Sequence, residues 1–172
     1  GREAALVFTA EGANVCVADV DVRLAEETVS LCEGPGDAFA LGVNVAEEAD
    51  VDRMCAETAA HFGGIDVLYN NAGISPPDDA SVLDTSVEAW QRVLDVNAKG
   101  VFLCCKHGIP YLLRRGGGSV INVASFVAIL GAATSQISYT ASKGAVLAMS
   151  RELAVQFARQ GVRVNALCPG PV

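Results

Sequence analysis

Short apolar runs alternate along this chain with longer segments whose apolar residues follow a helical spacing. Val51, Cys55 and Phe62, for example, fall on one face of a predicted helix that the glycines at 63–64 would end. The apolar runs are rich in β-branched residues, and they predict five strands, at residues 14–20, 38–43, 65–69, 119–123 and 162–167. Strand and helix therefore alternate from one end of the chain to the other.

This alternation favours an α/β fold. Consecutive parallel strands need crossover helices, so we expect a doubly wound parallel sheet with helices on both faces, the Rossmann arrangement. Ligands bind such a sheet at the carboxyl ends of its strands. The chain has 172 residues and no repeat or linker, so we expect a single domain over residues 1–172.

Both ends of this domain are expected to be incomplete. The first helix, from Arg2 to about Glu11 with Gly12 closing it, has no strand in front of it, although a βαβ unit needs one. That strand would lie at the centre of the sheet, so the strands at 14–20 and 65–69 should lack their common neighbour. The chain ends at residues 169–172, directly after a strand, where the loops of a substrate lid would follow.

Charge and composition narrow the range of partners. A net charge of −8 argues against a nucleic-acid surface and favours a small-molecule substrate. No apolar run approaches the roughly 20 residues that span a bilayer, and the start does not resemble a signal peptide, so we expect no membrane partner and a cytoplasmic location. The six cysteines lack CxxC spacing and are accompanied by only two histidines. We expect reduced core thiols and no metal site.

The segment Tyr139-Thr140-Ala141-Ser142-Lys143 carries the strongest chemical signal, within a helix predicted from about residue 138 to 160. Its spacing puts the Tyr139 phenol and the Lys143 ammonium on one face of that helix. A tyrosine with an ordinary pKa of about 10 is a poor base at neutral pH, but a nearby cation favours the phenolate. The alternative is that Tyr139 packs in the core while Lys143 reaches water.

Four further motifs stand in register with this segment. Asn70-Asn71-Ala72-Gly73 directly follows a predicted strand, Asn97 lies on a helix, Ser125 follows an apolar strand, and Pro169-Gly170 follows the last strand. Together with YTASK, their order and spacing resemble the classical short-chain dehydrogenase/reductase family over essentially the whole chain. The resemblance implies a Rossmann-fold, NAD(P)-dependent oxidoreductase acting on an alcohol or a ketone.

The resemblance also implies roles for a catalytic set. Tyr139 resembles the catalytic acid/base, and Lys143 the residue that activates it and binds the nicotinamide ribose. Ser125 would hold the substrate oxygen. Asn97 resembles the fourth member of the set, which helps to hold a water in a proton relay.

Asn97 can also be examined through the pattern around it. A helix that opens at Thr85, with Glu88 completing a capping box, would carry an apolar stripe on which Asn97 falls. A polar amide on that stripe must be hydrogen-bonded. A structural role, in which the amide bonds a neighbouring segment of backbone, is compatible with the role in the family.

Ser125 competes with Ser135, Ser138 and Ser142 for the role of the substrate-binding serine. We prefer Ser125 because it sits at the carboxyl end of a strand and because it matches the serine of the family. It lies 14 positions before Tyr139, one more than in many members of the family, and a loop can absorb that difference.

Asp19, at the end of the strand at 14–20, is the residue that selects the cofactor. Its carboxylate can accept hydrogen bonds from an adenine ribose and would repel a 2′-phosphate, so NAD is expected in preference to NADP. Alternatively, Asp19 caps the next helix, a role for which Asp21 competes. The other positions that the resemblance assigns to the cofactor are Gly1, Asn44, Val45, Asn71, Ala72, Gly73, Tyr139, Lys143, Pro169, Gly170 and Val172.

Two of these positions depart from the family pattern. Asn44 stands where many members have an aspartate beside the adenine. Gly1 aligns with the last glycine of the phosphate-binding loop, so the sequence contains almost none of that loop.

Three functions remain open. The leading one is an NAD-dependent dehydrogenase or ketoreductase for a small or medium secondary alcohol. A 3-oxoacyl carrier-protein reductase has similar motifs, but Asp19 disfavours the NADP that such enzymes usually use. A catalytically silent dinucleotide-binding or assembly module is the third. The resemblance also implies a homodimer or homotetramer, formed through the helices around residues 90–113 and 139–160.

Overall fold

The computed structural model describes residues 1–170 of the chain, in which five parallel strands form two sheets. β1 (Val15–Asp19) pairs with β2 (Ala38–Gly42), while β4 (Gly118–Val123) lies between β3 (Val67–Asn70) and β5 (Val162–Leu167). All five strands lie where the sequence predicted them, and the α/β class is confirmed. Within residues 1–170, β1 and β3 belong to different sheets, as expected for two strands without a common neighbour.

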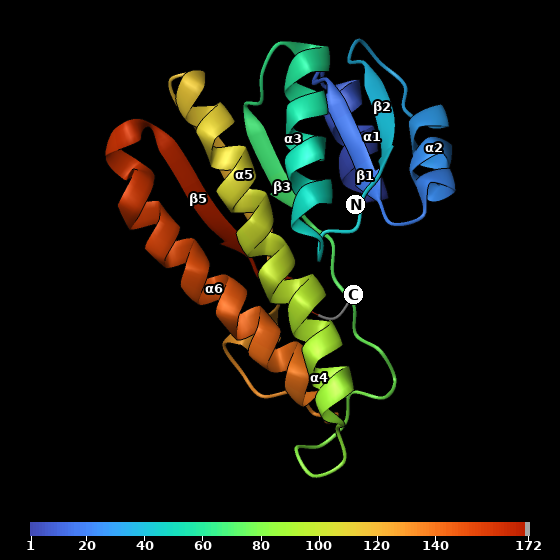
Figure 1. The fold of residues 1–172 in the computed structure, drawn as a ribbon, viewed down its shortest axis with the longest axis vertical. Helices are drawn as coiled ribbons and strands as arrows, with labels where there is room; N and C mark the ends of the chain where they lie inside the picture. Colours follow the sequence, from blue (N-terminus) through green and yellow to red (C-terminus); the bar gives the residue numbers. More distant parts are fainter. Residues whose placement is uncertain (171–172) are drawn as a thin grey trace.

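Helices pack against both sheets (Figure 1). α1 (Arg2–Ala10) and α2 (Val22–Ser30) pack on β1 and β2. α3 (Glu48–Phe62) packs on α5 (Gly100–Arg114), which lies against β3 and β4, while α6 (Ile137–Phe157) lies against β5. The predicted glycine stops are confirmed, because Gly12 and Gly63 both have positive φ angles, of 89° and 79°.

The long helical segment before β4 differs from its prediction. It consists of α4 (Val87–Leu94), a π-helical turn η1 (Asp95–Lys99) and α5. The predicted cap at Thr85 is wrong: Ser86 is the N-cap and accepts the N–H of Ala89, whereas the Thr85 hydroxyl accepts the N–H of Ala80. Adjacent hydroxyl residues make such caps ambiguous by one position, and the bond between Ala80 and Thr85 within the preceding loop is not visible in the sequence.

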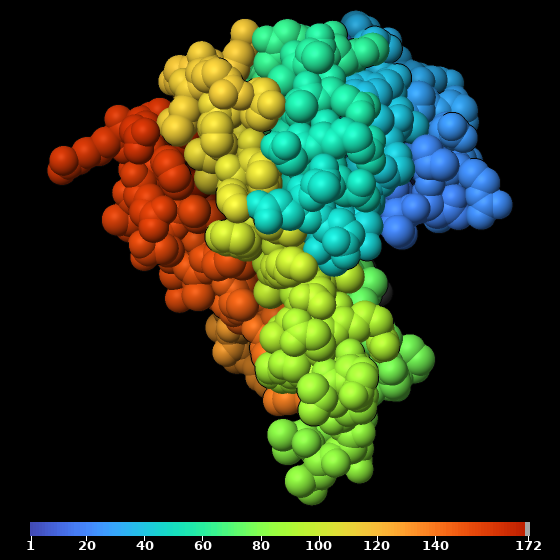
Figure 2. Space-filling view, in the orientation of Figure 1, coloured from blue at the N-terminus to red at the C-terminus, as the bar shows by residue number. Residues whose placement is uncertain are grey.

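The core lies between the β3–β4–β5 sheet and the helices on one of its faces. Its most buried members come from several elements, and they include Leu112, Val120, Val146 and Val162. The space-filling view shows that the segment containing α4 forms the narrow end of the molecule, away from this core (Figure 2). Among residues 1–170, no helix is both long enough and apolar enough to cross a membrane.

Candidate active site

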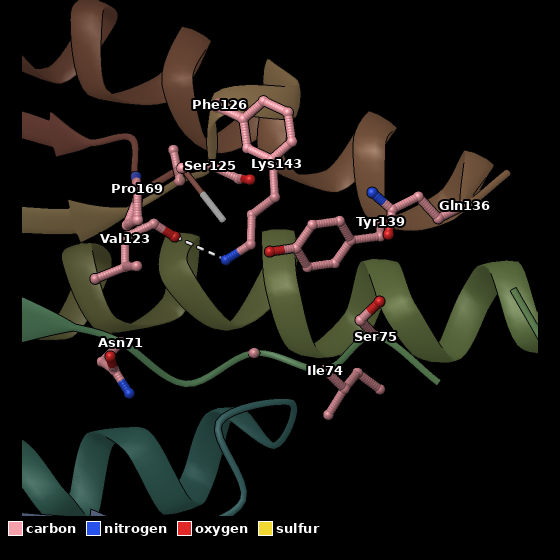
Figure 3. A pocket seen from close by; sticks show the side chains of 13 residues that line it. Asn71, Ile74, Ser75, Val123, Ser125, Phe126, Gln136, Tyr139, Lys143 and Pro169 are labelled. Carbon is pink, nitrogen blue, oxygen red and sulfur yellow. Dashed lines mark hydrogen bonds between the residues drawn. The ribbon is translucent and has the colours of Figure 1, made fainter. Parts of the chain in front are cut away.

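A cavity of about 450 Å³ opens where β3, β4 and β5 end and α6 begins. This is the edge of the sheet at which a parallel α/β architecture binds ligands. Figure 3 shows residues of the lining at the ends of these elements and in the loops that follow the strands. Its lining consists of Asn71, Gly73, Ile74, Ser75, Val123, Ala124, Ser125, Phe126, Gln136, Tyr139, Lys143, Pro169 and Gly170. Seven of these residues were predicted from the sequence as site residues, and the other six were not.

Lys143 is the only charged residue in that lining, and it is 4% exposed. Its Nζ donates a hydrogen bond of 2.7 Å to the carbonyl oxygen of Val123, at the end of β4 (Figure 3). Burial lowers the pKa of this ammonium, because the charged form loses hydration. An ammonium has three N–H donors, so the one bond to Val123 fixes the group and leaves two donors for the cavity.

Tyr139 lies on the same face of α6, one turn before Lys143. The Lys143 Nζ is 5.5 Å from the centre of the Tyr139 ring, and Figure 3 shows the tyrosine hydroxyl directed toward that ammonium. The alternative in which Lys143 reaches water is therefore wrong. The helix places a proton donor and a fixed positive charge beside the same cavity.

Of the four serines that competed at the sequence level, only Ser125 lines the cavity. It begins the short 3₁₀ helix η2 (Phe126–Ala128) at the end of β4, and its hydroxyl accepts the N–H of Val127. The Ser138 hydroxyl is buried without a hydrogen-bond partner in residues 1–170. Ser142 donates to the Tyr139 carbonyl oxygen, and Ser135 is exposed outside the lining.

Asn97 lies below the cavity, in the π-helical turn η1, and is fully buried. Its Oδ1 accepts the N–H of Ile74 at 2.7 Å, and its Nδ2 donates to the Ile74 carbonyl oxygen at 2.9 Å. Nδ2 also donates to the Ser142 hydroxyl at 3.0 Å. The amide therefore joins the loop after β3 to α6, which is the structural role that the pattern allowed.

The residues assigned to the adenosine end lie away from this cavity. Asp19 is exposed at the end of β1, and one of its oxygens accepts the N–H of Asp21. The competition for the helix cap is resolved, because Asp21 caps α2 and also pairs with Arg23 at 2.8 Å. The Asp19 carboxylate thus keeps a second oxygen for a ligand.

Asn44 and Val45 follow β2 and have different surroundings. The Asn44 side-chain oxygen accepts the N–H of Ala46, so its NH₂ group is the part left to face a ligand. Val45 packs so closely on the start of α5 that a side-chain carbon at Gly100 would lie 2.8 Å from it. The departure from aspartate at position 44 therefore replaces an acceptor by a donor.

Glycines leave room for a dinucleotide along the loop after β3. A Cβ on Gly73 would lie 3.3 Å from both the Asn97 Oδ1 and the Lys143 Nζ, so a larger residue at this position would crowd both polar atoms. Gly1 lies beside the same loop, where a Cβ would be 3.0 Å from the Asn71 Nδ2. Ala72 is exposed between these glycines. The free donors of Lys143 and Asn44, together with the glycines of this loop, fit a nicotinamide dinucleotide. Val172, which was also assigned to the cofactor, lies outside the described residues.

Sequence reasoning missed a buried polar network behind the cavity. Asn122 of β4 is fully buried; its Oδ1 accepts from Asn70 at 2.8 Å and its Nδ2 donates to Ser150 at 3.0 Å. The network joins β3, β4 and α6, so it fixes the relative positions of the elements that carry the site. The only signal was a polar residue within the apolar strand, which by itself does not reveal its partners.

Comparisons with known proteins agree with this geometry. A family model described as enoyl-(acyl carrier protein) reductase matches residues 1–172. The 2-(R)-hydroxypropyl-CoM dehydrogenase of Xanthobacter autotrophicus is 40% identical, over 100% of this chain and 70% of its own length. The 3-oxoacyl-[acyl-carrier-protein] reductase of Staphylococcus aureus is 37% identical, over 99% of this chain and 69% of its own length.

A solved structure from Burkholderia xenovorans, described as a putative short-chain dehydrogenase/reductase, superimposes with a TM-score of 0.94. It is 32% identical, and the alignment covers 100% of this chain and 65% of the other. The chain therefore spans between 65% and 70% of the length of these three proteins.

Proposed function

Because the chain belongs to the short-chain dehydrogenase/reductase family, we propose that it forms the core of an oxidoreductase that interconverts a secondary alcohol and its ketone. The observation that carries this proposal is the meeting of Ser125, Tyr139 and Lys143 around one cavity. A hydroxyl, a phenol and a fixed ammonium are the groups needed to hold an oxygen atom and to move its proton.

The residues of the chain divide the chemistry as follows. Ser125 orients the substrate oxygen, and the Tyr139 hydroxyl exchanges a proton with it. Lys143 is anchored by the Val123 carbonyl oxygen, and its charge stabilises negative charge on the Tyr139 oxygen during that exchange. Its remaining donors would bind the ribose of the nicotinamide. The bound cofactor supplies the site that accepts or donates the hydride.

The Tyr139→Phe variant tests this assignment. The substitution removes the exchangeable proton and keeps the ring, so kcat should fall by about 10²–10⁴ while the affinity for NAD(H) stays within a fewfold. Turnover of a panel of small secondary alcohols and a separate cofactor titration measure the two quantities. A variant that keeps more than about a tenth of the wild-type kcat would show that Tyr139 is a packing residue.

For the cofactor, we propose NAD rather than NADP. The exposed Asp19 carboxylate supports NAD, because a 2′-phosphate there would meet a like charge, and Arg23, which could offset it, is paired with Asp21. We expect kcat/KM to be at least tenfold higher with NAD(H), a difference of about 1.4 kcal/mol, and the Asp19→Ala variant to narrow this gap. Equal use of both cofactors by the wild type would contradict the proposal.

Reduction of a 3-oxoacyl carrier protein is the second candidate. The relative from Staphylococcus aureus carries that name, and the description of the matching family model also names an acyl carrier protein. If this candidate is correct, the protein should reduce a substrate attached to a carrier protein more efficiently than a free ketone of similar size. The comparison of the two substrates with NADH and NADPH therefore separates this candidate from the leading one.

We also propose that the protein is a homodimer or homotetramer and that it resides in the cytoplasm. Large apolar side chains exposed on α4, α5 and α6 support association: Val87 is 76% exposed, Phe102 51% and Val155 80%. The cysteines, all free, fit a reducing compartment.

A further inference from the structure

Asp79, in the loop between β3 and α4, is a buried carboxylate outside the predicted catalytic set. It is 6% exposed, and within residues 1–170 it forms no ion pair with a lysine, arginine or histidine. One of its oxygens accepts the N–H of Ser138 at 2.9 Å, and the other accepts the N–H of Tyr139 at 2.8 Å. A buried carboxylate is tolerated only when it is hydrogen-bonded, so the start of α6 is its partner.

The start of α6 needs these acceptors. The first N–H groups of a helix have no partner inside it, and a side chain at the N-cap usually accepts those of the second and third residues. Gln136, the N-cap of α6, provides no such bond. Asp79, which lies 57 residues before Gln136 in the chain, accepts these N–H groups instead. The Ala80 carbonyl oxygen accepts the N–H of Ile137, the first residue of the helix, at 3.2 Å.

The loop that carries Asp79 is itself held on both sides. Asp78 forms two hydrogen bonds of 2.7 Å with Arg92 of α4, and the Arg92 guanidinium lowers the pKa of that carboxyl. Asn97 bonds both backbone groups of Ile74, at the beginning of the loop. Asp79 is therefore attached to a fixed segment and can impose a position on α6.

We propose that Asp79 is a positioning residue for Tyr139. Both its oxygens bind the first turn of α6, and one of them binds the backbone of Tyr139 itself, so it fixes the point from which the phenol extends into the cavity. Helix ends fray when their N–H groups lack acceptors, and a displacement of about 1 Å at a reacting group costs roughly 10² in rate. This inference rests on the proposed function of Tyr139.

The test compares Asp79→Ala, Asp79→Asn and the control Asp84→Ala in the full-length gene product. Asp79→Ala removes both acceptors, whereas an asparagine keeps one. We expect kcat for a small secondary alcohol with NAD to fall by about 10- to 100-fold in Asp79→Ala and by less in Asp79→Asn. The affinity for NAD should stay within about threefold. Asp84 is an exposed carboxylate of the same loop that accepts a hydrogen bond from the Ser81 hydroxyl rather than from α6, so its variant should retain activity.

Amide hydrogen exchange provides a second readout that is independent of turnover. In Asp79→Ala, exchange should accelerate at Ser138 and Tyr139 but not in the second half of α6. Unchanged exchange at Ser138 and Tyr139, or an equal loss of kcat and NAD affinity, would overturn the positioning role. A wild-type protein without turnover would contradict the proposed function alone, and the exchange result would then decide whether Asp79 holds Tyr139.

Discussion

At the scale of single residues, burial has different consequences for the thiols of this chain and for Lys143. The thiols of Cys55 and Cys104 lie in the core, and burial raises the pKa of each to about 12. A thiol that is almost never ionised at neutral pH is a packing group. Lys143 is as buried as these thiols, but it faces the cavity and is bound by a carbonyl oxygen. Burial alone does not distinguish Lys143 from these thiols, so the role that we propose for it depends on its immediate partners.

Burial of the Lys143 ammonium predicts a dependence of stability on pH. Its pKa is lowered in the folded state, so between that value and the pKa of about 10.4 of an unfolded lysine the unfolded state binds more protons. Stability then rises with pH. At lower pH both states are protonated, and the folded state bears the full cost of burying the charge.

Urea unfolding of the wild type and of Lys143→Met at several pH values from 7 to about 10.4 measures this effect. The wild type should gain stability relative to the variant as the pH increases, because methionine has no proton to lose. A difference that stays constant or shrinks would contradict a lowered pKa for Lys143. The same variant should be inactive. Turnover then measures the contribution of the lysine to catalysis, and urea unfolding measures its contribution to stability.

At the scale of elements, the π-helical turn η1 is the feature that joins the loop after β3 to the helices. A π-helical turn adds one residue to the helical circuit and is often found at functional sites. Here it carries the Asn97 side chain that bonds both backbone groups of Ile74. The position of the cavity lining at residues 73–75 therefore depends on one amide in the middle of a long helical segment.

The Asn97→Leu variant tests this dependence. Leucine has a similar volume but leaves the N–H and the carbonyl oxygen of Ile74 unpaired, which should lower the free energy of unfolding by about 1–3 kcal/mol. Lys99→Ala, at an exposed position of the same turn, is the matched control and should change it by less than about 0.5 kcal/mol. Chemical denaturation measures both. Equal effects of the two substitutions would contradict the role assigned to Asn97.

At the scale of the whole molecule, the chain forms two parallel sheets that helices and side chains connect. Phe8 of α1 meets Tyr69 of β3 edge to face, with ring centres 5.9 Å apart, so α1 reaches from one sheet to the other. Among the exposed large apolar residues, Val87, Phe102 and Val155 lie on α4, α5 and α6. The face formed by these helices is where we propose that copies of the chain associate.

Light scattering of the full-length gene product at micromolar concentration tests this association. The wild type should be a dimer or a tetramer, and Val155→Glu should shift it toward the monomer because a charge would be buried in the interface. Val7→Glu is the control, since Val7 is 57% exposed on α1, outside the three helices of the proposed interface. A monomeric wild type, or an equal effect of both substitutions, would contradict the proposed interface.

The sequence by itself determined the elements and the family resemblance. Local periodicity gave all five strands, because a side chain alternates or recurs with the geometry of its own element. The spacing of Tyr139 and Lys143 placed both on one face of α6 for the same reason. The resemblance then selected Ser125, which is the one of the four competing serines that lines the cavity.

Only the tertiary structure decided which distant residues complete the site. Asp79 caps a helix that begins 58 residues later, and Asn122 joins two strands to a helix through its amide. Neither contact follows a local period, because each depends on how the chain returns after a crossover. The misassigned cap at Thr85 has a local origin instead, since its hydroxyl accepts the N–H of Ala80 within the same loop. Local geometry is encoded over a few residues, whereas the partner of a buried polar group is fixed only when all the elements have packed.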